Sequence, residues 1–103
     1  MTLETFEQSV AASAPPPGLT PALEALWHDA KGDWEMAHTR AQADEGRAGA
    51  WVHAYLHRKE GDAANAAYWY RRASQPVAAG PLDAEWADVA RALLLASSDA
   101  AGS

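Results

Sequence analysis

Apolar residues recur along most of this chain at roughly every third or fourth position, which is the spacing of one face of an α-helix. The clearest stripe consists of Trp86, Val89, Ala90 and Leu93. Alanine fills 26 positions, whereas valine occurs four times and isoleucine is absent. Because small and straight-chain residues favour helices while β-branched residues favour strands, we expect an all-α protein.

Caps and breakers divide this pattern into five or six helices. Thr2 and Thr20 can each cap a helix start, and Asp83 can cap the last one. Gly32-Asp33 and Gly61-Asp62 each combine a helix stop with the cap of the next helix, so both turns should be very tight. The expected order is an N-terminal helix in residues 1–13, a Pro-rich spacer in 14–19, a helical domain in 20–96 and a frayed, disordered tail in 97–103. Within the domain, helices are expected at about residues 21–31, 34–45, 50–60, 63–75 and 84–96.

Length, charge and composition narrow the class of protein. A chain of 103 residues can bury a core as one domain. It has no cysteine, no basic and apolar leader, and no apolar run long enough to span a bilayer. We therefore expect a soluble cytoplasmic protein without disulfides. The net charge of −6 argues against nucleic-acid binding, because the neutralisation of phosphates needs surplus lysine and arginine.

The chain also repeats itself once. The segment LWHDAKGD at residues 26–33 matches YLHRKEGD at residues 55–62, an offset of 29 residues that aligns a histidine, a glycine and an aspartate. Internal repeats of this kind are typical of stacked helical hairpins, which usually bind other molecules. The sequence therefore favours a binding protein over an enzyme.

The second copy carries a family resemblance. In residues 61–73, GDAANAAYWYRRA, the Gly-Asp turn followed by Ala66, Tyr70 and Ala73 resembles the second helix of a tetratricopeptide-like repeat, and the Trp69-Tyr70 pair resembles the Sel-one-like subclass. The resemblance covers about residues 20–76, with a period of 29 where roughly 34 is usual. It implies a right-handed stack of antiparallel helical hairpins that binds peptides or partner proteins in a concave groove. It brings no catalytic residues.

The segment AWVHAYLHRKEGD at residues 50–62 is also similar to segments of small bacterial proteins, and no activity comes with that resemblance.

A candidate binding surface follows from the helical phase of residues 63–75. With Ala66 and Tyr70 facing inward, Tyr68 falls on the opposite face beside Arg71 and Arg72. Half of all lysines and arginines lie in the hairpin of residues 53–75. We expect a non-catalytic module that binds an acidic segment of a partner protein between these two helices. The contacts would be Tyr68, Arg72, Arg71, Asn65, His57 and His53.

Two other interpretations of the basic hairpin stay open. Tyr68 could pack against the last helix while the arginines only solvate that face. The basic charges could also attract acidic residues of the same chain, such as Glu35, Asp44 and Glu45, or those of a second copy in a homodimer.

The alternative function is metal binding or metal-dependent catalysis. His53, His57 and Glu60 lie at i, i+4 and i+7 on one side of a helix, and two histidines with a carboxylate form the ligand set of some iron and zinc sites. Without a metal, the two histidines would simply be half-buried residues of a polar face. Phosphate-binding loops, nucleophile elbows and zincin motifs are absent. Asp29 and Asp33 could form an acid–base set, but Asp33 is better explained as a helix cap. We therefore expect no cofactor.

Overall fold

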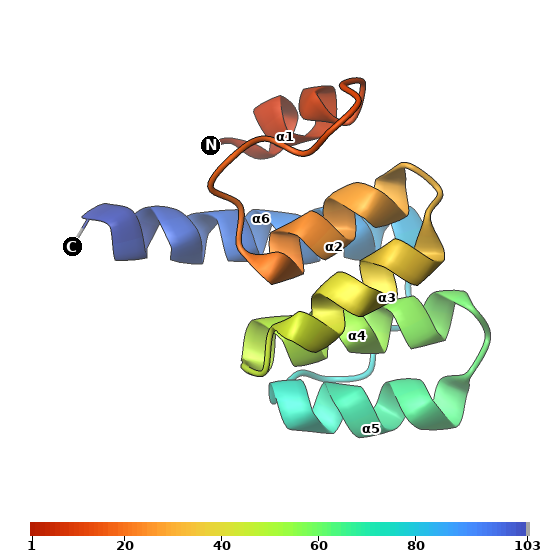
Figure 1. Ribbon diagram of the computed structural model, residues 1–103. Coiled ribbons are helices and arrows are strands. Elements are labelled where there is room, and N and C mark those ends of the chain that lie inside the picture. Colours follow the sequence, from red (N-terminus) through yellow and green to blue (C-terminus); the bar gives the residue numbers. More distant parts are fainter. Residues whose placement is uncertain (103) are drawn as a thin grey trace.

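The computed structural model describes the backbone of residues 1–102 and the side chains of residues 1–97. Six α-helices and no strand occur in this part of the chain, which confirms the all-α prediction. The helices are α1 (Leu3–Ser9), α2 (Pro21–Ala30), α3 (Trp34–Ala43), α4 (Arg47–Lys59), α5 (Ala63–Ala73) and α6 (Leu82–Gly102). In Figure 1, α2 to α5 follow one another in chain order and α6 returns beside α2, below α1. No helix in the described residues is both long and apolar enough to cross a membrane.

The two copies of the repeat form matching turns between α2 and α3 and between α4 and α5. Gly32 and Gly61 have φ angles of +86° and +91°, a left-handed conformation that glycine adopts without strain. The N–H of the following aspartate donates to the carbonyl five residues earlier, at 3.0 Å and 2.9 Å. The side chains of Asp33 and Asp62 then cap α3 and α5 by accepting from the N–H three residues later. Both caps were predicted, and each joins two helices into a hairpin.

Several helix ends differ from the prediction. α4 begins at Arg47, before the expected residue 50, because Gly49 is not a breaker but a buried residue of the first turn. A Cβ atom there would lie 2.0 Å from the carbonyl oxygen of Asp44, so only glycine fits this close approach. α5 ends at Ala73, earlier than expected, because Ser74 takes a left-handed conformation with φ of 59°.

The last helix also differs from the prediction. α6 begins at Leu82, so Asp83 lies in its first turn rather than at the capping position. The backbone of residues 97–102 is helical where a frayed tail was expected, and Ser103 lies outside the described residues.

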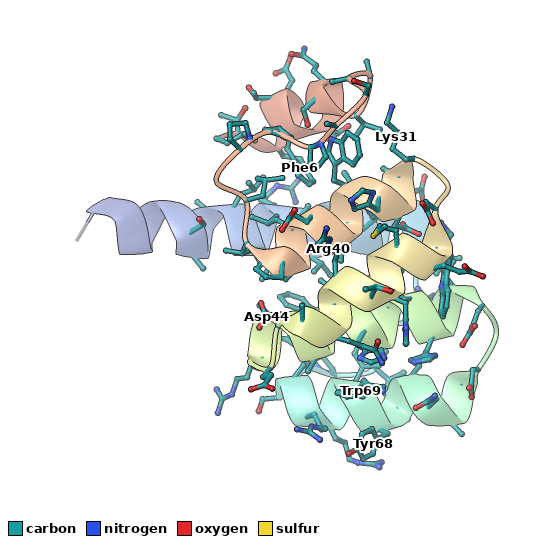
Figure 2. The ribbon with its side chains drawn as sticks, in the orientation of Figure 1. Phe6, Lys31, Arg40, Asp44, Tyr68 and Trp69 are labelled. Atoms are coloured by element: carbon teal, nitrogen blue, oxygen red, sulfur yellow. The ribbon has the colours of Figure 1, made fainter. Side chains whose placement is uncertain are left out.

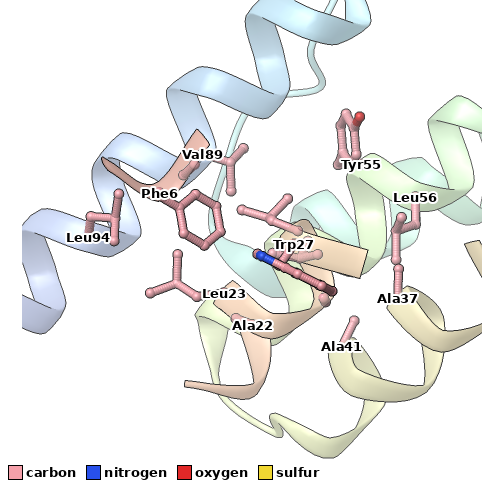
Figure 3. Packing of buried hydrophobic residues seen from close by; sticks show 14 residues of the cluster. Phe6, Ala22, Leu23, Trp27, Ala37, Ala41, Tyr55, Leu56, Val89 and Leu94 are labelled. Atoms are coloured by element: carbon pink, nitrogen blue, oxygen red, sulfur yellow. The ribbon is translucent and has the colours of Figure 1, made fainter. Parts of the chain in front are cut away.

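The main core lies between α1, α2, α3, α4 and α6. Phe6 of α1 is fully buried, and its ring stacks on Trp86 of α6 with centroids 5.7 Å apart. Figure 2 shows Phe6 pointing from α1 toward the helices below it. The indole N–H of Trp86 donates to the carbonyl of Leu26 on α2 at 3.0 Å. Figure 3 shows how Leu23 and Val89 fill the space around Phe6. The N-terminal helix is thus part of the same core as the domain.

The helix α4 lies at the centre of the molecule. It packs against α2, α3, α5 and α6, so it is covered on almost every side. As a consequence, His53 and His57 are 4% and 7% exposed, although the sequence pattern put them on a polar, half-buried face. Their surroundings define the candidate site.

Candidate functional site

Three histidines meet where α3, α4 and α5 come together. His38 projects from α3, and His53 and His57 project from successive turns of α4. One ring nitrogen of each lies within 4.8 Å of the other two. The Nε2 atoms of His38 and His53 are 2.8 Å apart, so one of them donates its proton to the lone pair of the other. We call these three residues the histidine cluster.

Two tryptophans hold the rings of the histidine cluster in place. Trp34 stacks on His38 with centroids 4.9 Å apart and an interplanar angle of 12°. Trp69 of α5 stacks on His53 at 3.9 Å and 15°. The indole N–H of Trp34 donates to the carbonyl of Leu56 at 3.0 Å, which fixes that tryptophan against α4. The rings therefore have little freedom to rotate.

Glu60 does not join the histidines as the predicted third ligand. Its carboxylate accepts a hydrogen bond from Nδ1 of His57 at 2.7 Å, so it contacts one histidine only. The amide nitrogen of Asn65 lies 3.5 Å from Nε2 of the same ring. Both contacts suit the tautomer of His57 that carries its proton on Nδ1 and keeps a lone pair on Nε2. The third imidazole is His38, which the sequence analysis missed.

The surroundings favour the neutral form of two imidazoles of this cluster, those of His38 and His53. Burial lowers the pKa of His53 to about 4, and the nearby His38 and His57 add to this effect. Burial also lowers the pKa of His38, helped by His57 and opposed by Glu60. At neutral pH these two rings therefore carry lone pairs and no charge.

A cavity of about 650 Å³ opens next to His53. It lies between the α3–α4 turn and the C-terminal half of α5. Its polar lining includes Asp44, Glu45, Arg47, His53 and Arg72. Two arginines and two carboxylates share the cavity, so its charge is balanced rather than basic.

The predicted aromatic and basic surface lies on the outer side of α5. Tyr68 is 43% exposed, so it is not buried against α6. The guanidinium of Arg72 lies over two rings, 5.8 Å from the centroid of Tyr68 and 5.2 Å from that of Trp69, and donates to the Tyr68 hydroxyl at 3.0 Å. Figure 2 shows Tyr68 at the outer edge of α5 and Trp69 on the side toward α4. Arg71 is exposed as well.

The predicted contact set therefore splits into two layers. His53 and His57 lie inside, between the helices, whereas Tyr68, Arg71 and Arg72 lie outside. Trp69 connects the layers, because His53 stacks on its ring and Arg72 lies above it. In the sequence, Trp69 stands out only as part of the repeat pattern. The sequence offered one weak signal for each of the two missed residues. His38 follows Trp34 by four residues, and Trp69 stands next to Tyr68.

The other two basic residues of the hairpin pair within the chain. Lys59 lies 2.8 Å from the buried Asp29, which also accepts from the hydroxyl of Tyr55 at 2.9 Å. Arg58 lies 2.8 Å from the buried Glu85. These pairs attach α4 to α2 and α6, so among the described side chains only Arg71 and Arg72 of this hairpin's basic residues form no ion pair.

Comparisons of the chain with protein-family models, with curated proteins and with solved structures found no match.

Proposed function

We propose that the protein is a non-catalytic interaction module of the cytoplasm, built as a divergent stack of tetratricopeptide-like hairpins, that binds an acidic segment of a partner protein. The observation that carries this proposal is the exposed side chain of Tyr68 beside Arg71 and Arg72. Among the side chains that the structure describes, no carboxylate forms an ion pair with either arginine.

This surface has the composition of a binding hot spot. An exposed tyrosine offers a flat contact area and loses little conformational entropy on binding. Arg72 is already positioned by the two rings beneath it, so less freedom is lost when its guanidinium binds a carboxylate with two hydrogen bonds. The acidic character of the ligand follows from these two arginines.

The neighbouring cavity extends the surface. Arg72 and Trp69 line both the outer face and the cavity, so a peptide bound over Tyr68 could place one side chain inside. Because Asp44 and Glu45 offset the charges of Arg47 and Arg72 in the cavity, an acidic side chain would gain little there. We therefore expect the carboxylates of the ligand to bind at Arg71 and Arg72, and an apolar or polar side chain to fill the cavity.

Selection from a displayed library of random peptides tests this proposal. The wild-type protein should enrich peptides with aspartate or glutamate, and a Tyr68→Ala, Arg72→Ala variant should not. Lys31→Ala is a matched control, because Lys31 also lies over a tryptophan ring, 5.3 Å from the centroid of Trp27, at a different place on the molecule. Enrichment of the same peptides by the double variant would place the binding surface elsewhere.

A homodimer has weaker support than a peptide complex. Arg58 and Lys59 are engaged in ion pairs within the chain, which leaves fewer basic residues to attract the acidic surface of a second copy. Light scattering over a range of protein concentrations distinguishes a monomer from a homodimer. A mass that rises to twice that of the chain would establish the dimer.

A further inference from the structure

We propose that the histidine cluster, His38, His53 and His57, binds a single Zn²⁺ ion. This site lies beneath the peptide surface and shares Trp69 and the cavity with it, but zinc binding needs no peptide. Three imidazoles are a known ligand set for zinc, which takes three protein ligands and leaves a fourth position for water or another ligand. Imidazole nitrogen also suits the other borderline divalent ions, such as Co²⁺ and Ni²⁺, which therefore serve as probes.

The distances between the ring nitrogens fit one ion. Two nitrogens bound to zinc at about 2.0–2.1 Å in tetrahedral geometry lie roughly 3.3 Å apart. The closest pair in the histidine cluster is 2.8 Å apart, and all three nitrogens lie within 4.8 Å of one another. The required separation falls between these values. Small ring rotations would therefore be enough, and the ion would replace the hydrogen bond between His38 and His53.

The surroundings of the cluster resemble a preorganised metal site. A histidine that binds a metal usually donates its other ring N–H to a carboxylate, which fixes the tautomer and orients the ring. Glu60 holds Nδ1 of His57 in this way at 2.7 Å. Trp34 and Trp69 fix the rings of His38 and His53 by stacking. Each ligand therefore has its own positioning residue.

An ion can also reach the site. The cavity of about 650 Å³ is lined by His53, so it connects one ligand with the solvent. Because the carboxylates of Asp44 and Glu45 balance the charges of Arg47 and Arg72 there, the opening does not repel a cation.

Zinc titration of the tag-free full chain, after removal of bound metal by a chelator, tests the proposal. Calorimetry should show one Zn²⁺ ion per chain, and zinc should raise the melting temperature because it binds the folded state. Long-range nitrogen–proton spectra of the histidine side chains need no variant. Zinc should shift the ring nitrogens of all three clustered histidines but not those of His28, which packs against Trp27 outside the cluster.

Matched variants identify the ligands. His38→Gln and His57→Gln should each abolish the binding of one Zn²⁺ ion per chain, whereas His28→Gln should leave zinc binding unchanged. Glu60→Gln should weaken binding by about 10–100-fold, the usual effect of losing a carboxylate that orients a metal-binding histidine. Circular dichroism of each variant without metal confirms that it is folded before its affinity is compared.

Two results would overturn the proposal. If zinc causes neither heat nor a shift of the histidine nitrogens in the wild type, the three histidines only pack against one another. If His57→Gln abolishes binding but His38→Gln does not, the ion lies instead among His57, Glu60 and Asp62, which form a second group of close ligand atoms.

Discussion

Acidification should destabilise the metal-free protein through His53. Its folded-state pKa is lowered from 6.5 to about 4, chiefly by burial and further by His38 and His57. A proton therefore binds the unfolded chain more tightly than the folded one, so stability is complete above the unfolded pKa and is lost as the pH falls toward the folded one. The full shift corresponds to about 3 kcal/mol, because one unit of pKa is worth about 1.4 kcal/mol. About 2 kcal/mol should already be lost near pH 5.

Urea unfolding between neutral pH and about pH 4, with a chelator present, measures this loss. Other groups also titrate in this range, so the useful quantity is a difference between two proteins. The matched variant is His53→Gln, which cannot take up a proton but can still form a hydrogen bond with His38. The wild type should lose about 3 kcal/mol more than this variant over the range. Equal losses in the two proteins would show that His53 is not held in its neutral form.

Three further changes test the fold by chemical unfolding. Gly61→Val should cost about 1–2 kcal/mol, because φ is +91° there and a β-branched residue is strained at that angle; Gly61→Asn should cost less, and equal losses would exclude the left-handed turn. Gly49→Ala should cost about 1–3 kcal/mol, since the new methyl group would meet the backbone of Asp44; an unchanged free energy of unfolding would contradict the close approach. Glu85→Ala should cost about 2–3 kcal/mol, because the buried hydroxyl of Tyr70 loses its acceptor and Arg58 keeps only the carbonyl of Gly80; a loss no larger than that of an exposed pair would contradict this buried network.

The sequence by itself determined the class of secondary structure and much of where helices begin and end. The caps at Thr2, Thr20, Asp33 and Asp62 were predicted and are present, because each depends on a hydrogen bond within four residues. The tight Gly-Asp turns were predicted for the same reason. Local signals were less reliable where a residue's role is to let two parts of the chain pack closely. Glycine commonly interrupts helices, so the sequence marked Gly49 as a helix breaker. The contact with Asp44 that requires glycine there exists only in the folded chain.

The candidate site required the tertiary structure. Helical periodicity placed His53 and His57 on one face of α4, but it could not say which helix would cover that face. His38 is 15 residues from His53 in sequence, and the packing of α3 against α4 brings their ring nitrogens to 2.8 Å. The packing of α5 against α4 left Tyr68 exposed and put Trp69 on His53. A helix fixes the direction of its own side chains through backbone geometry, whereas their neighbours depend on how helices cross, and that is decided by the fit of the whole core.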